Sequence, residues 1–135
     1  MASIRREILV EADPKEVWAA IRDVGAVHTR LAPGFVVDTQ LEEGARIVTF
    51  ANGLVARELI VDVDDEARRL VWAVVGGRLS HHNASLQVLS EREGDCRVVW
   101  IADLLPNELS GVIAGLIDQG MGVMKKTLET AAAVS

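Results

Sequence analysis

The most regular pattern of apolar positions in the chain lies near its C-terminal end. Between Asn107 and Thr130, one stripe of residues recurs at the spacing of a helix face. The stripe consists of Leu109, Ile113, Leu116, Gly120, Met124 and Thr127, flanked by Val112, Ile117, Val123 and Leu128. It predicts one amphipathic helix of about 24 residues, roughly 36 Å long. Because Gly120 has no side chain, either the helix packs closely on its neighbour there or space remains beneath it, and we expect space.

The region between Pro33 and Pro106 has the pattern of strands separated by turn residues. Six strands are predicted, over Phe35–Leu41, Ala45–Ala51, Leu54–Val63, Arg69–Val75, Leu79–Ser90 and Cys96–Leu105. Asn52-Gly53 is the strongest signal for a tight hairpin. The acidic residues from Asp62 to Glu66 predict a solvated turn. Because every connection is short, we expect neighbouring strands to pair as an antiparallel meander.

The beginning of the chain predicts one strand and two short helices. Ser3–Glu11 alternates as a strand does, although Arg6 interrupts its apolar face. Asp13-Pro14 is typical of a helix start, and Gly25 of a helix end. The apolar stripe of this first helix consists of Val17, Trp18 and Ile21. A second short helical segment is predicted over Ala26–Leu31.

Length and composition limit the classes of protein to consider. A chain of 135 residues is enough for one domain, residues 1–135. Its net charge of −6, without a coherent basic face, argues against nucleic-acid binding. The single Cys96 excludes an internal disulfide and a thiolate zinc cluster. No apolar run reaches the roughly 18 residues that span a bilayer, and no signal peptide is evident. We expect a soluble, cytoplasmic protein that does not insert into membranes.

The order of strand, two short helices, six strands and long helix resembles the helix-grip fold of the SRPBCC superfamily, which includes START and birch-pollen-allergen proteins. The segments Asp13–Trp18, Val98–Trp100 and Leu105-Pro106 resemble its polyketide cyclase/dehydrase-like branch in particular. The resemblance covers essentially the whole chain. It implies an α+β fold, in which a curved antiparallel sheet of seven strands wraps the long C-terminal helix and encloses a cavity for an apolar ligand.

Strand alternation indicates which side chains face such a cavity. Trp100 shares a face with Val98, and His82 shares one with Leu86, whereas His81 falls on the opposite face. The ordinary pKa of histidine, about 6.5, suits His82 to proton transfer or to hydrogen bonding with a guest. The alternative is a histidine at the rim or a hydrogen-bonded core histidine. We expect the ligand to contact His28, Phe35, Trp72, His82, Trp100, Leu116, Gly120 and Met124.

Arg57 and Glu58 are adjacent in one predicted strand, so one should face the cavity and the other the solvent. An inward Arg57 could anchor a carboxylate, enolate or phenolate. An inward Glu58 could be a base whose pKa is raised by burial. The alternation of Leu59, Val61 and Val63 favours Arg57 inward, whereas Ala56 and Ile60 favour the opposite. A third reading places both charges on the sheet surface.

Two functions follow as hypotheses. The first is a domain that binds a small hydrophobic molecule. The second is an enzyme of the polyketide cyclase, aromatase or dehydratase type, with His82 or Glu58 as base and Arg57 or His28 stabilising oxyanion charge. We expect no cofactor and no metal, because His81 and His82 diverge and no third ligand has a suitable spacing. The polar face of the long helix carries Gly111, Gly115 and Gly122. Such small residues would allow a helix of a second subunit to approach, so a homodimer is one possibility.

Overall fold

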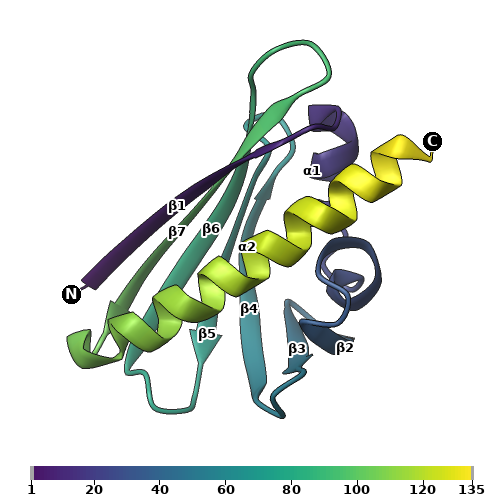
Figure 1. Cartoon of the computed structure of the whole chain (residues 1–135). Helices are drawn as coiled ribbons and strands as arrows, with labels where there is room; N and C mark the ends of the chain where they lie inside the picture. The colour runs from purple at the N-terminus through teal and green to yellow at the C-terminus, as the bar shows by residue number, and fades with distance from the viewer. Residues whose placement is uncertain (1, 135) are drawn as a thin grey trace.

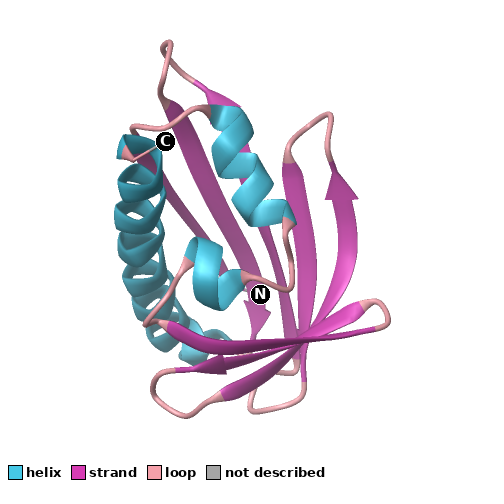
Figure 2. Ribbon diagram, turned by 90° about the vertical axis from the view of Figure 1, so that its right-hand side faces the viewer, coloured by secondary structure: helices cyan, strands magenta, loops and turns pink. Residues whose placement is uncertain are grey.

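The computed structural model describes residues 2–134 and consists of a seven-stranded antiparallel sheet curved around helices (Figures 1 and 2). The elements are β1 (Ala2–Val10), α1 (Pro14–Arg22), the π-helical turn η1 (Val27–Leu31), β2 (Val36–Glu42), β3 (Ala45–Phe50), β4 (Val55–Asp64), β5 (Arg69–Val75), β6 (His81–Ser90), β7 (Cys96–Leu105), the 3-10 turn η2 (Asn107–Leu109) and α2 (Ser110–Ala133). The strand order is β1-β7-β6-β5-β4-β3-β2. The predicted helix-grip fold is therefore confirmed.

Helix α1 begins where the sequence predicts. The Asp13 carboxylate accepts a hydrogen bond from the backbone N of Lys15 at 2.9 Å, and Pro14 occupies the first helical position. The helix ends at Arg22, however, and not at Gly25. Gly25 instead lies against the side chain of Leu41. A Cβ at this position would come within 2.8 Å of Leu41 Cδ1. A close approach of two segments, and not a helix cap, accounts for this glycine.

The turn between β4 and β5 holds α1 in place. Asp65 is largely exposed, as predicted for a solvated turn. Its Oδ1 also accepts hydrogen bonds from Trp18 Nε1 at 2.9 Å and from Arg22 Nε at 2.7 Å. Both donors come from α1, and they lower the pKa of Asp65. The turn therefore connects the sheet to the helix as well as reversing the chain.

Arg6, which interrupts the apolar face of β1, reaches across to the long helix. Its Nε lies 2.8 Å from Oδ1 of Asp118 in α2. α2 packs on β1 and η1 and runs diagonally across the concave side of the sheet (Figure 1). On the outer side of α2, a Cβ at Gly111, Gly115 or Gly122 would meet no atom within 4 Å. The open space agrees with the approach of a second subunit but does not test it, so the homodimer stays a prediction.

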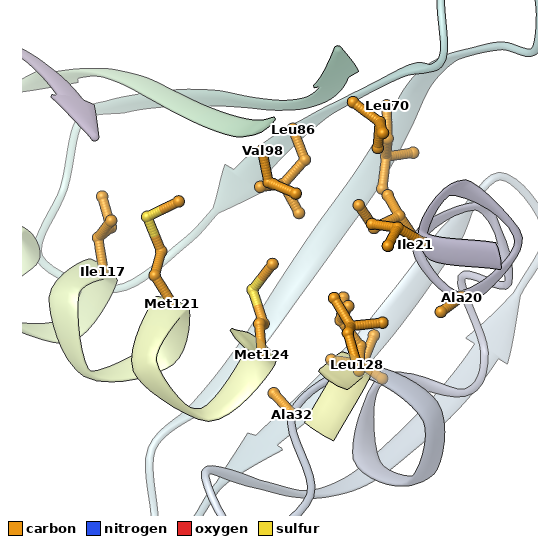
Figure 3. Close-up of a cluster of buried hydrophobic side chains, with 14 of the residues drawn as sticks. Ala20, Ile21, Ala32, Leu70, Leu86, Val98, Ile117, Met121, Met124 and Leu128 are labelled. Carbon is orange, nitrogen blue, oxygen red and sulfur yellow. The ribbon is translucent and has the colours of Figure 1, made fainter. Parts of the chain in front are cut away.

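The core lies between the concave face of the sheet and the helices. In Figure 3, Ile21 of α1 lies beside Leu70 of β5, and Met121 and Met124 of α2 point toward the sheet. Ile21, Leu70 and Met124 are almost completely buried. Ile21 and Leu70 belong to the solid part of the core, in the half of the molecule that α1 covers.

Candidate functional site

A cavity of about 370 Å³ lies under the N-terminal half of α2. Its walls come from η1, from strands β2 to β7, from the loop between β5 and β6 and from α2, and they are mostly apolar. Representative wall residues are Leu31, Val48, Leu86, Ile113 and Ile117. The volume falls in the range of about 300–1,000 Å³ that is usual for small-molecule sites.

Most of the side chains predicted to contact a ligand line this cavity. They are Phe35, Trp72, His82, Trp100, Leu116, Gly120 and Met124. His28 does not belong to the wall, so its predicted place in the site is wrong. The reason is local, because Val27 and Leu31, four residues apart, supply the inner side of η1. His28 Nδ1 is enclosed and has no hydrogen-bond partner among residues 2–134.

Gly120 does not leave an empty gap under α2. A Cβ at this position would lie 3.0 Å from Cε2 of Phe35, so the aromatic ring occupies the room that the glycine provides. The same ring packs edge-on against Phe50, with ring centroids 5.4 Å apart. Close packing at the glycine is therefore the observed arrangement. Gly120 and Phe35 both border the cavity, so the position of this ring influences its shape.

Trp72 and Trp100 form an aromatic part of the wall. Their ring centroids are 5.7 Å apart and their planes are inclined by 64°. Trp100 Nε1 is enclosed and has no hydrogen-bond partner within residues 2–134. An unpaired buried donor is uncommon in folded proteins.

His82 carries a similar unpaired atom. Its Nδ1 is enclosed and makes no hydrogen bond within residues 2–134. Burial, with a smaller contribution from His81, lowers the pKa of His82, so the imidazole is neutral at neutral pH. A neutral imidazole has one donor and one acceptor nitrogen, and because Nδ1 is enclosed, a hydrogen bond or proton exchange between His82 and a guest would go through Nε2.

The structure decides between Arg57 and Glu58. Glu58 is buried and lines the cavity, whereas the Arg57 side chain is 46% exposed and its Nε lies 3.4 Å from Oε1 of Glu42. The inward placement of Arg57 is therefore wrong. The cause is a β-bulge between Ile60 and Asp62, after which the alternation is reversed, so that Asp62 points outward and Val63 inward. The apolar residues after the bulge therefore do not indicate which side chains before it, such as Arg57 and Glu58, point into the cavity.

The sequence analysis missed the partner of Glu58, which is Arg46 on β3. Arg46 Nε lies 2.8 Å from Glu58 Oε1, and the two side chains are only 5% and 9% exposed. The Arg46 guanidinium also lies over the Trp72 ring, 5.4 Å from its centroid. The register of this hairpin is centred on Asn52, whereas the two-residue turn expected at Asn52-Gly53 would pair Arg46 with Leu59, so the predicted hairpin did not bring the opposite charges together.

Burial raises the pKa of Glu58, and the charge and hydrogen bond of Arg46 oppose that rise only in part. Glu58 is therefore a better proton acceptor than an ordinary carboxylate. Together, Glu58 and His82 provide two groups in the wall that can bind or move a proton. Cys96 lies away from this wall, and burial raises the pKa of its thiol to about 11, which keeps it unreactive.

Residues 2–134 contain no group of three His, Cys, Asp or Glu side chains arranged to hold a metal ion. Of the helices in this range, none has the length and apolar character needed to cross a membrane.

Comparisons with known proteins agree with this architecture. The model of the family described as polyketide cyclase/dehydrase and lipid transport matches residues 1–133. No curated protein matches the sequence. A Bacillus thuringiensis protein has a similar structure, with a TM-score of 0.84 and 14% identity over 94% of this chain and 98% of that one. A Thermobifida fusca protein gives a TM-score of 0.78 and 28% identity over 99% and 95%.

Norcoclaurine synthase from Thalictrum flavum, in complex with dopamine and hydroxybenzaldehyde, is also similar in structure. Its TM-score is 0.76 at 19% identity, over 98% of this chain and 87% of that one. At this level of identity the likeness establishes a common fold.

Proposed function

Since the chain belongs to the polyketide cyclase/dehydrase and lipid-transport family of SRPBCC proteins, we propose that residues 1–135 form one domain that binds a small, mainly apolar molecule between the sheet and α2. The cavity of about 370 Å³ is the observation that carries this proposal. Apolar walls with a few polar groups are typical of sites that bury most of a small guest.

The aromatic wall and the structural neighbours favour a guest that contains a ring. Trp72 and Trp100 place two indole rings in the cavity wall. The complex of norcoclaurine synthase with dopamine and hydroxybenzaldehyde supports the idea that this fold can hold small aromatic molecules. A cyclase-type reaction on a carbonyl compound would use the same cavity, with Glu58 as proton acceptor, and would add a chemical step to binding.

The proposal is tested with two matched glycine variants of α2 and the uncharged fluorescent probe N-phenyl-1-naphthylamine. In Gly120→Leu, the new side chain and the displaced Phe35 ring take up cavity volume, so we expect probe affinity to fall at least about tenfold. In Gly122→Leu the same change is made where a Cβ would meet no atom within 4 Å, so affinity should not change.

Circular dichroism confirms that both variants fold, and Leu116→Trp provides a second way to fill the cavity. Unchanged probe affinity in folded Gly120→Leu and Leu116→Trp proteins would reject the cavity as the binding site. Native mass spectrometry of protein purified from its own host would then identify a retained guest directly.

A further inference from the structure

A row of polar side chains crosses the inner face of the sheet. Arg46 of β3 is opposite Glu58 of β4, and Glu58 is opposite Val74 of β5. The β5–β6 register pairs Ala73 with Asn83, so the next pair along brings His82 of β6 beside Val74. With strands about 4.8 Å apart, the Cα atoms of Glu58 and His82 are separated by about 10 Å. The row places the charged pair and the neutral histidine on one wall of the cavity.

The Glu58 carboxylate has one oxygen in use and one free. Oε1 accepts the hydrogen bond from Arg46 Nε. Oε2 makes no hydrogen bond within residues 2–134, yet it is not among the fully enclosed polar atoms, so it remains open to the cavity that Glu58 lines. A carboxylate oxygen in an apolar environment is costly to leave without a donor. A guest that enters the cavity can supply that donor.

The charges of the wall are already balanced. Arg46 and Glu58 neutralise each other, and the stacking of Arg46 on Trp72 holds the guanidinium in place. Arg78, the other charged residue of the lining, is exposed to solvent in the loop between β5 and β6. A charged guest would therefore enter without a buried counter-ion, at a large desolvation cost.

From this arrangement we propose that the cavity selects an uncharged guest whose apolar ring system carries a hydroxyl group, and that the hydroxyl donates its hydrogen bond to Oε2 of Glu58. The inference rests on the proposed function and adds the chemical class of the guest. Glu58 is then the residue that determines specificity, and Arg46 positions it by holding Oε1.

Four naphthalene derivatives of similar size test this selection by competition with N-phenyl-1-naphthylamine. We expect 2-naphthol to bind about tenfold more tightly than naphthalene, which lacks the hydroxyl, and more tightly than 2-methoxynaphthalene, which has no hydrogen to donate. The anion 2-naphthoate should bind more weakly than naphthalene. If naphthalene and 2-naphthol displace the probe equally, the cavity binds apolar molecules but the hydroxyl selection is wrong.

The double variant Arg46→Met, Glu58→Leu removes both buried charges and keeps a similar volume, a replacement that proteins often tolerate. It should bind naphthalene as the wild type does and lose the preference for 2-naphthol. The matched control is Arg57→Met, Glu42→Leu, which removes the exposed ion pair beside it on the outer face. The control should keep the full preference. Retention of the preference by the inner double variant would overturn the inference.

A single substitution gives a second test, should the double variant not fold. In Glu58→Gln, Arg46 Nε needs the amide oxygen as acceptor, so the amide NH₂ group faces the cavity in place of Oε2. A donor now meets the guest, and the hydroxyl of 2-naphthol and the ether oxygen of 2-methoxynaphthalene can both accept from it, so the preference for 2-naphthol over 2-methoxynaphthalene should disappear. Retention of that preference would show that Oε2 does not contact the guest. Failure of every probe, including N-phenyl-1-naphthylamine, would instead reject the proposed function.

Discussion

The two ends of the core are built from the same sheet but are filled differently. Under α1 the interior is solid, and Ile21 and Leu70 are almost fully buried. Under the N-terminal half of α2 it is hollow, with about 370 Å³ of free volume. Each end contains a tryptophan, but Trp18 donates its N–H to Asp65 whereas Trp100 keeps an enclosed N–H without a partner in residues 2–134. The packed end therefore pairs its tryptophan donor within the fold, whereas the end with the cavity encloses one that residues 2–134 do not pair.

The length of the covering element explains the difference. α1 inserts four buried residues, Val17, Trp18, Ala20 and Ile21, between itself and the sheet. η1 is a single turn, and only Val27 and Leu31 of it are buried. A short element cannot fill a curved sheet of this width, so space remains between η1, α2 and the strands.

The largest expected contrast is between equivalent truncations at the two ends. Ile21→Ala opens a new hole in close packing and should lower the free energy of unfolding by about 2–5 kcal/mol. Ile113→Ala enlarges a space that already exists and introduces a better helix former, so its cost should be about 1 kcal/mol. Urea unfolding measures both values. Equal losses would mean that the cavity end contributes as much to stability as the packed end.

The two tryptophans give a smaller contrast. Trp18→Phe removes a hydrogen bond to a carboxylate and should cost about 1–2 kcal/mol of unfolding free energy. Trp100→Phe removes an enclosed donor that has no partner within residues 2–134, and this gain offsets the lost ring contacts, so the net change should be near zero. Asp65→Ala should reduce the cost of Trp18→Phe in a double-mutant cycle. Additive costs in that cycle would show that the Trp18–Asp65 bond contributes nothing.

The sequence predicts the elements well because each depends on local pattern and turn chemistry. It predicts individual wall residues only where the strand is regular. His82 and Trp100 lie on regular strands and line the cavity, whereas the bulge after Ile60 is the reason why alternation left the choice between Arg57 and Glu58 open. Arg46 was missed because a charged residue in a strand normally indicates the solvent face. The contact of Phe35 with Gly120 joins segments far apart in the chain, and alternation carries no information about it.

The smallest contrast is in pH dependence. Because burial lowers the pKa of His82, the unfolded chain takes up this proton more readily than the folded protein. The contribution of His82 to stability is therefore complete above about pH 6.5 and declines as the pH falls from there toward the folded pKa. At the packed end, Arg22 and Trp18 lower the pKa of Asp65, so its contribution is lost only as the pH falls below the ordinary value of 3.8.

Measuring His82→Gln beside the wild type isolates this effect, because the raised pKa of Glu58 acts in the opposite direction above its ordinary value of 4.5 in both proteins. As the pH is lowered from 7.5 to 5.5, the unfolding free energy of the wild type should fall relative to that of His82→Gln. The shift should be small, since the ring is partly solvated. For Asp65→Asn, the difference in unfolding free energy from the wild type should stay constant between pH 7.5 and pH 5.5. It should change only at a pH near or below the ordinary pKa of 3.8. A flat difference for His82→Gln would place its imidazole in water, and the polar row would then end at Glu58.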